Sequence, residues 1–152
     1  MSEHNASEQR SAQDDSTQGW PEHLPVTQVR IARPTDRLDA LVAFYTALGL
    51  TTLGEFHDHD GYDGVFLGLP GTGHHLEFIH HRDGSPGAAP SAEHLLVFYL
   101  GSAEAVAATT ERLAALGHAA VDAENPYWRN AGAVTIPDPD GWRVVLVPNA
   151  GI

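Results

Sequence analysis

The sequence predicts an α+β fold built from two tandem copies of one strand–helix–three-strand (βαβββ) unit. Ala47-Leu48-Gly49 recurs as Ala115-Leu116-Gly117, an offset of 117 minus 49, or 68 residues. The same shift carries Leu76-Glu77-Phe78 onto Val144-Val145-Leu146, so one register holds from the helix to the last strand of each unit. Duplicated units that cannot bury their apolar faces alone pack against each other. A concave site is therefore expected between them.

Two further matches align the other strands of the repeat. At the offset of 68, Val65-Phe66-Leu67 falls over Ala133-Val134-Thr135. At the start of the units, Gln28-Val29 falls over His94-Leu95 with an offset of 66, which differs by two residues from the offset of the later elements.

The first unit is expected over residues 25–82. Its opening strand is Val26–Arg33, where apolar and polar residues alternate until Pro34 ends the run. A helix follows up to Leu48, with apolar residues at helical spacing and Gly49 as its C-terminal cap. Short runs divided by Asp/Gly and Pro/Gly turns complete the unit as three strands. They are Thr51–Phe56, Gly64–Leu69 and His74–Ile79.

The second unit repeats this order over residues 93–149. A linker over residues 83–92, rich in glycine and proline, separates it from the first unit. Its helix is expected over Ala103–Leu116, with Gly117 as the cap. Asp138-Pro139-Asp140-Gly141 is a turn sequence before the last strand. The expected strands are His94–Leu100, Ala119–Asp122, Gly132–Ile136 and Trp142–Val147.

Composition narrows the classes of function. Residues 1–24 are polar and acidic without an apolar stretch, which predicts a disordered leader instead of a secretory signal and favours the cytoplasm. The net charge of -12, from 20 acidic and 8 basic residues, argues against nucleic acid as a partner. No apolar run is long enough for a membrane span, so no membrane partner is expected. Without cysteine, only His, Asp, Glu and Gln remain as metal ligands.

Three motifs of the doubled unit indicate a family. Ala43-Phe44-Tyr45, Ala47-Leu48-Gly49-Leu50 and the Asp138-Pro139-Asp140-Gly141 turn occur in the order seen in the vicinal oxygen chelate (VOC) superfamily, which the chain resembles from Val26 to Pro148. That superfamily includes glyoxalase I, extradiol dioxygenases, fosfomycin-resistance enzymes and bleomycin-binding proteins. The resemblance implies two modules whose curled sheets form a concave cup. It also implies a homodimer, in which modules from two chains complete each cup.

The same resemblance implies one divalent metal in the cup, either nickel, zinc, manganese or iron. The ligand positions of the family fall on Gln28, Glu77 and His94. The fourth position, a carboxylate in a glyoxalase-like enzyme, falls on Val145, which supplies neither charge nor a metal bond. The site is therefore expected to bind metal weakly and to lack one general base. In the homodimer, Gln28 and Glu77 of one subunit would meet His94 of the partner subunit.

Six residues are candidates for contact with a small-molecule ligand: Arg30, His75, Phe98, Tyr127, Trp128 and Arg143. The two arginines suit a carboxylate or phosphonate if the strand phases point them into the cup, and they are surface ion-pair residues otherwise. His75 shares a strand face with Glu77 by the two-residue period, which makes it a better candidate than the neighbouring histidines.

Aromatic and histidine-rich segments leave further alternatives open. Tyr127 and Trp128 lie in an expected loop, where they either stack on a flat ligand or plug one end of the cup, and Phe98 is expected to line the cup beside them. His57 and His59 alternate with aspartates and either bind a cation or are free surface histidines.

Two functions follow from these candidates. The first is a protein resembling the bleomycin-resistance proteins, which binds a small molecule in the cup, with catalysis undecided; Val145 favours this interpretation. The alternative is a metal-dependent enzyme of the lyase or isomerase, dioxygenase or thiol-transferase type, acting on a small oxygen-bearing substrate. Glu77 and His94 favour that alternative.

Overall fold

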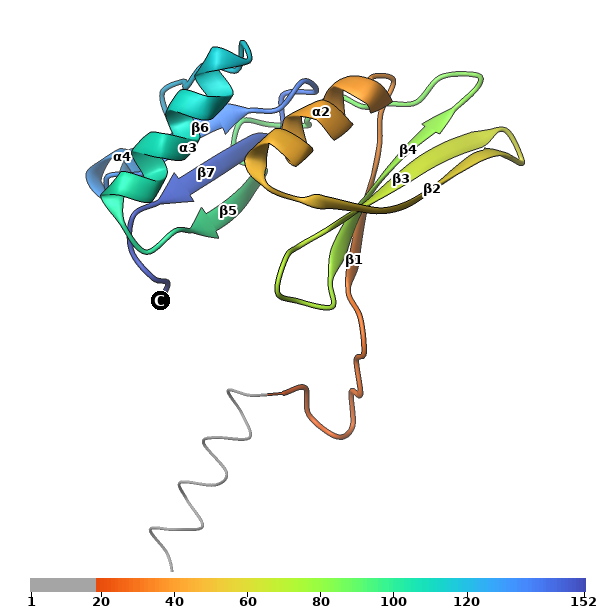
Figure 1. Cartoon of the computed structure of the whole chain (residues 1–152), viewed down its shortest axis with the longest axis horizontal. Helices are drawn as coiled ribbons and strands as arrows, with labels where there is room; N and C mark the ends of the chain where they lie inside the picture. Colours follow the sequence, from red (N-terminus) through yellow and green to blue (C-terminus); the bar gives the residue numbers. More distant parts are fainter. Residues whose placement is uncertain (1–18) are drawn as a thin grey trace, which may run out of the picture.

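The computed structural model describes residues 19–152 and contains the two expected units side by side (Figure 1). Residues 1–18 of the expected leader lie outside the described residues. The first unit comprises β1 (Arg30–Pro34), α2 (Leu38–Leu48), β2 (Thr51–His59), β3 (Tyr62–Gly68) and β4 (His75–His81). The second comprises β5 (Leu95–Tyr99), α3 (Ala103–Ala115), α4 (Pro126–Asn130), β6 (Val134–Pro137) and β7 (Arg143–Val147).

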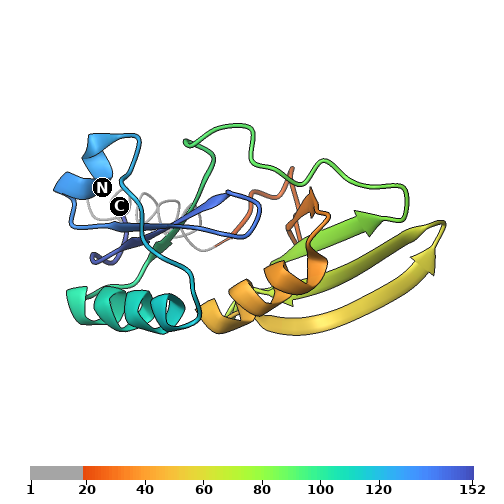
Figure 2. The same ribbon diagram turned by 90° about the horizontal axis from the view of Figure 1, so that it is seen from above.

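Each unit forms its own open sheet, which confirms the α+β fold. The first sheet has the order β1-β4-β3-β2 and the second has the order β5-β7-β6. In both, the strand before the helix pairs in parallel with the last strand of its unit. Seen from above, α2 and α3 follow one another along the same side of the molecule (Figure 2). No helix within residues 19–152 is long and apolar enough to cross a membrane.

The second unit departs from the expected pattern after its long helix. The strand expected over Ala119–Asp122 is reduced to one bridge between Val121 and Thr135. The chain then enters the short helix α4, where a loop was expected. Asn125 begins that helix by accepting a hydrogen bond from the backbone N–H of Tyr127, and Pro126 occupies its first turn. Cap and proline chemistry of this kind starts a helix without any hydrophobic period.

The strand pairing also shifts the internal alignment at the first strand. Arg30 pairs with His75, and Leu95 pairs with Arg143. His75 and Arg143 lie 143 minus 75, or 68, residues apart, whereas Arg30 and Leu95 lie 95 minus 30, or 65, apart. The predicted match of Gln28 with His94 is therefore one residue out of register. The connections from strand to helix are equally long in the two units, and the difference arises in the helices, because α2 has 11 residues and α3 has 13.

A similar shift occurs at the third strand. Val65 pairs with Phe78, and Val134 pairs with Leu146. The first members differ by 134 minus 65, or 69, so Val65 corresponds to Val134 and not to Ala133. Both valines belong to or border the hydrophobic core, and a one-residue slip would turn each to the other side of its sheet.

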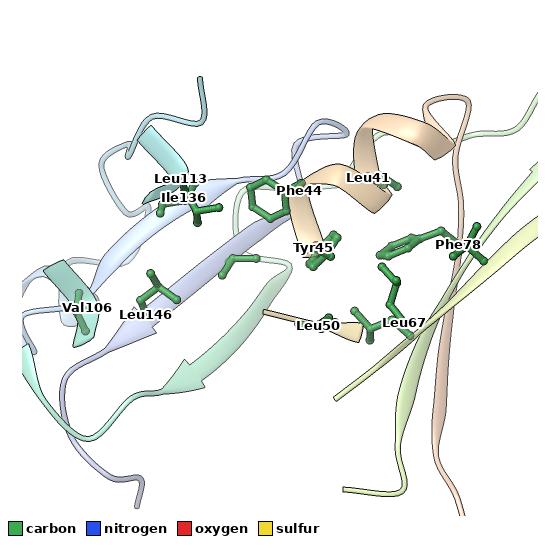
Figure 3. Close-up of a cluster of buried hydrophobic side chains, with 13 residues drawn as sticks. Leu41, Phe44, Tyr45, Leu50, Leu67, Phe78, Val106, Leu113, Ile136 and Leu146 are labelled. Carbon is green, nitrogen blue, oxygen red and sulfur yellow. The ribbon is translucent and has the colours of Figure 1, made fainter. Parts of the chain in front are cut away.

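One hydrophobic core joins the two units. Phe44 and Tyr45 of α2 extend between the sheets, with Phe78 on one side and Ile136 on the other (Figure 3). Tyr45 stacks on Phe78 with ring centroids 5.0 Å apart. Because α2 contributes to both halves of this core, neither unit closes its apolar side alone.

A polar network crosses the same core. The Tyr45 hydroxyl donates to Asp138 Oδ2 at 2.6 Å, and the Arg33 guanidinium donates to Asp138 at 3.0 Å and to the Tyr45 oxygen at 2.8 Å. Asp138 also accepts from the backbone N–H groups of Asp140 and Trp142, which closes the turn before β7. Burial, reinforced by the Asp138 carboxylate, raises the pKa of Tyr45 well above its usual range. The network therefore ties β1, α2 and the β6–β7 turn together.

Candidate functional site

The side of each sheet turned away from its helix is here called its helix-free face. Leu76 and Phe78 of β4 enter the core with α2, so the alternating residues His75 and Glu77 lie on the helix-free face of the first sheet. Glu77 therefore faces away from the helix layer and shares its strand face with His75, as the two-residue period predicted. Arg30 shares the face because it is the ladder partner of His75.

Arg30, His75 and Glu77 form a compact polar group on that face. Arg30 Nε donates to His75 Nε2 at 2.8 Å, and an Arg30 terminal nitrogen lies 3.6 Å from Glu77 Oε2. The Arg30 side chain is 48% exposed, whereas that of Glu77 is 11% exposed. A half-exposed guanidinium is thus held by two buried side chains beneath it.

An aromatic ring lies against the guanidinium, and a second ring packs on the first. The Arg30 guanidinium carbon lies 4.6 Å from the centroid of the Phe66 ring, a cation–π contact. Phe66 also meets His75 edge-on at 5.8 Å and Phe56 at 5.7 Å. The Phe56 ring lies directly over Gly64, where a Cβ atom would collide with it. The face therefore combines one cation with an aromatic surface.

Neither phenylalanine appeared among the sequence-based candidates. Their signal was weak: Phe66 lies between two core residues, Val65 and Leu67, and alternation alone places it on the opposite face. The position of Phe56 depends on the irregular pairing of β2 with β3, which the sequence pattern does not reveal.

The orientation of the His75 ring follows from its bond to Arg30. Because Nε2 accepts the Arg30 proton, the neutral imidazole carries its own proton on Nδ1. This Nδ1 is buried and has no hydrogen-bond partner within residues 19–152. An unpaired buried donor costs about 1–3 kcal/mol. The hydrogen bond of His75 with Arg30 and its edge-on contact with Phe66 hold the ring in place and offset that cost.

The helix-free face of the second sheet is filled by its own chain. Val145 is fully buried but stands outside the shared core, and its ladder partner is Thr135. Trp128 of α4 lies against this face and, with Thr135 and Arg143, lines a space too narrow for a water molecule. Arg143 donates to the backbone oxygen of Asp122 at 3.0 Å. Of the two interpretations of Trp128, this arrangement matches the plug.

The remaining aromatic candidates lie apart from that face. Phe98 packs against the hydrophobic core, on the opposite side of its sheet from Arg143, because its ladder partner is the core residue Leu146. Tyr127 is 61% exposed, and its ring meets Trp128 edge-on with centroids 5.1 Å apart. The structure therefore brings together Arg30 and His75, and separately Trp128 and Arg143, but not all six candidates.

The three expected metal ligands do not converge within one chain. Gln28 donates to the Gly73 carbonyl at 2.9 Å and stands four residues before Ala32, the ladder partner of Glu77. At about 3.3 Å per residue, that separation is about 13 Å. His94 bonds Ser91 through Nδ1 at 2.7 Å and packs on Trp142. Between residues 19 and 152, no cluster of three or more His, Asp or Glu side chains is arranged to hold a metal ion.

Other polar features lie outside this group. His57 lies 3.5 Å from Glu55 and 3.9 Å from Asp63, on the exposed hairpin formed by β2 and β3. Two open hollows of about 430 and 470 Å³ flank the start of α2, where Asp36 lines both. Burial raises the pKa of Asp140, which lines the smaller hollow. These hollows contain none of the predicted site residues, and their carboxylates disfavour an anionic ligand.

Comparison with known proteins matches both units. Residues 29–79 match the YycE-like N-terminal domain, and residues 93–148 match the YycE-like C-terminal domain. The uncharacterized protein YycE of Bacillus subtilis (strain 168) is 50% identical over 126 residues, which cover 82% of this chain and 90% of that protein. A crystal structure of a YycE protein of unknown function from Bacillus subtilis has a TM-score of 0.82 at 47% identity, covering 87% of this chain and 96% of that one.

More distant structures share the fold alone. FosX, a fosfomycin resistance protein from Listeria monocytogenes, has a TM-score of 0.63 at 20% identity, covering 80% of this chain and 92% of that one. Glyoxalase I from Leishmania major has a TM-score of 0.57 at 20% identity, covering 81% and 84%. The two domain matches and the Bacillus subtilis relative show that the chain belongs to the YycE-like family, and the solved structures show that it has the fold of the vicinal oxygen chelate superfamily.

Proposed function

We propose that this protein binds a small anionic molecule on the helix-free face of its first sheet, with Arg30 as the ligand's main contact. The observation that carries the proposal is the half-exposed guanidinium fixed between His75, Glu77 and the Phe66 ring. A guanidinium that is already oriented presents its free N–H groups to a carboxylate or phosphonate with little further loss of side-chain entropy. Binding, without an assigned reaction, is the function that this geometry supports.

The aromatic surface indicates the rest of the ligand. Phe66 and Phe56 offer ring faces beside the cation, so an anion attached to a flat or apolar group gains contacts with both. Phosphonates are a reasonable starting class, because FosX of Listeria monocytogenes, which shares the fold, was solved with Mn(II) and 1S,2S-dihydroxypropylphosphonic acid.

Calorimetric titration with phenylphosphonate and benzoate tests the proposal, with benzamide as the uncharged analogue. The native chain should bind the two anions and not benzamide. Arg30→Met should weaken anion binding by about tenfold or more, because the loss of one charge-assisted contact is worth about 1.5–3 kcal/mol. Arg82→Met is the matched control, since Arg82 is exposed and lies outside the polar group. Equal affinity in native protein and Arg30→Met would overturn the proposal.

The alternative function, a metal-dependent enzyme, rests on the buried carboxylate of Glu77 beside the imidazole of His75. It would also need His94, and a homodimer is the route by which His94 of the partner subunit would approach Glu77. Mass spectrometry of untagged protein purified without chelator tests this alternative. Near-stoichiometric metal that is lost in both Glu77→Ala and His94→Ala would favour it. Light scattering that shows a monomer at micromolar concentration would remove the homodimer route.

A further inference from the structure

The donor atoms that a divalent metal would use on the first sheet are already engaged by Arg30. His75 Nε2 offers its lone pair to Arg30 Nε at 2.8 Å, and Glu77 Oε2 faces an Arg30 terminal nitrogen at 3.6 Å. Imidazole nitrogen and carboxylate oxygen are the usual protein ligands for zinc, nickel and iron(II), at about 2.0–2.2 Å. The guanidinium thus occupies the position beside these two donor atoms where a metal ion would have to bind.

We propose that Arg30 is a built-in substitute for a metal cation: its guanidinium supplies the positive charge between His75 and Glu77 and excludes divalent ions from them. This inference rests on the proposed anion-binding function, for which Arg30 is the cation. It deepens that function by assigning the ligand class to anions bound directly by a guanidinium, with no metal between protein and ligand.

Three features make the substitution stable. An arginine stays charged at any pH at which a protein is folded, so the charge is permanent. The Phe66 ring under the guanidinium holds it by a cation–π contact. Glu77 is almost fully buried, and a buried carboxyl group needs a polar or cationic partner. Arg30 meets that need, whereas the predicted ligand Gln28 lies about 13 Å along the strand and carries no charge.

The second sheet has apolar residues at the ladder positions that Arg30 and Glu77 occupy in the first sheet. At the equivalent ladder positions, Leu95 replaces Arg30 and Val145 replaces Glu77. That face offers no carboxylate at the position of Glu77. Any metal site built from facing sheet residues would therefore have to form around His75 and Glu77, where Arg30 stands.

The substitution Arg30→His tests the inference directly. It removes the guanidinium and adds an imidazole beside His75 and Glu77, which completes two histidines and one carboxylate, a ligand set that holds divalent iron, cobalt or zinc. Cobalt chloride is the probe, because Co²⁺ bound to nitrogen and oxygen ligands has a visible spectrum. Affinity for Co²⁺ should rise by about 10- to 100-fold over the native chain and fall again in Arg30→His/Glu77→Gln.

Two controls separate this site from the many surface histidines. Gln28→His adds an imidazole four residues before Ala32, just ahead of β1, and should leave Co²⁺ affinity at the native level. The native chain and Glu77→Gln should bind equal, low amounts of Co²⁺. This second comparison needs no Arg30 variant, so it remains valid even if Arg30→His fails to fold. Circular dichroism shows whether Arg30→His is folded.

The outcomes are distinct. Metal in the native chain that depends on Glu77 would overturn the inference, as would a folded Arg30→His that gains no affinity for Co²⁺. A gain in Gln28→His equal to that in Arg30→His would also overturn it. If the metal results hold but the native chain binds neither phenylphosphonate nor benzoate, then Arg30 still excludes metal and only the proposed anion binding fails.

Discussion

The two helix-free faces occupy equivalent places in a duplicated unit, yet they have opposite chemistry. On the first, Arg30 stands opposite His75 and Glu77 stands opposite Phe66; on the second, Leu95 stands opposite Arg143 and Val145 stands opposite Thr135. The first face is open and carries a cation, whereas the second is covered by Trp128. The scaffold therefore does not determine function. A few outward-facing strand positions do, and only the first copy carries an arginine, a histidine and a glutamate together there.

This contrast depends on both sheets sharing one core, and Asp138 is the residue whose loss would test that most severely. Asp138→Ala leaves the Arg33 guanidinium, whose side chain is 12% exposed, without its carboxylate, and it removes the acceptor of the Tyr45 hydroxyl. Breaking a buried ion pair from one side costs about 3–5 kcal/mol. We expect a loss of this size in the free energy of unfolding, measured by urea denaturation.

The manner of unfolding is as informative as its size. Circular dichroism and tryptophan fluorescence should follow one transition, because a shared core unfolds as one unit. Asp39→Ala is the control, since Asp39 is an exposed aspartate on α2 outside the network. Two separate transitions in Asp138→Ala would mean that the two sheets unfold independently. Their helix-free faces would then not belong to one folding unit.

The next largest effect should come from uncovering the second face. Trp128→Ala removes the side chain that lines a narrow space with Thr135 and Arg143. A fully buried tryptophan costs about 3–5 kcal/mol on truncation, and we expect about 2–3 kcal/mol because Trp128 is half-buried. Tyr127→Ala, at the adjacent exposed position, should change stability by about 0.5 kcal/mol or less. Equal losses in the two variants, measured by urea denaturation, would show that Trp128 is not a cover.

Much of this architecture was predictable because it depends on local patterns. The helical spacing before Gly49 and the alternation in β4 led to α2 and to the outward position of Glu77. Where prediction failed, the cause was information that local patterns lack. The alignment of Gln28 with His94 depended on the different lengths of α2 and α3, and a single-residue error exchanges the two faces of a strand.

The site shows the same limit. Alternation does not tell which face of β5 meets the core, and only the packing of β5 and β7 on the shared core reveals that Phe98 faces the helices. The pairing of Arg30 with His75 is a contact between residues 45 positions apart, which no local pattern contains. Strand alternation nevertheless led to both residues as candidates, because it grouped His75 with Glu77 and directed Arg30 into the expected cup.

A pH experiment would sharpen the role of the central network. The folded-state pKa of Tyr45 is raised above its unfolded value of 10.0, so the folded state favours the protonated hydroxyl. Its contribution to stability is complete below pH 10 and is lost as the pH rises above 10. Relative to Tyr45→Phe, the native chain should lose about 1.4 kcal/mol for each pH unit above 10.

Urea denaturation at several pH values between 8 and about 11 measures that slope, since model tyrosines titrate near pH 10. The chain contains neither lysine nor cysteine, so tyrosines are the side chains that titrate between about pH 9 and 11. Tyr62→Phe is the matched control, because Tyr62 is 41% exposed, and it should retain the native slope. A native slope that persists in Tyr45→Phe would assign the pH dependence to another tyrosine.

The smallest expected effect on stability concerns Gly64 of β3, which lies under the Phe56 ring on the helix-free face of the first sheet. Ala133 of the second unit corresponds to Gly64 at the offset of 69 derived for this strand, 133 minus 64, so Gly64→Ala makes the first sheet resemble the second there. The added Cβ would collide with the Phe56 ring, whose flexible side chain can swing away, and stability should fall by only about 1 kcal/mol. Phenylphosphonate affinity should nevertheless decrease, because Phe56 would leave the aromatic surface beside Arg30.

Gly54→Ala on β2 is the control: its Cβ would meet Phe66 at 3.7 Å, an ordinary contact, and affinity should not change. Calorimetry that shows equal affinities for both variants would place the ligand away from Phe56 and reduce the difference between the two faces to the polar group alone.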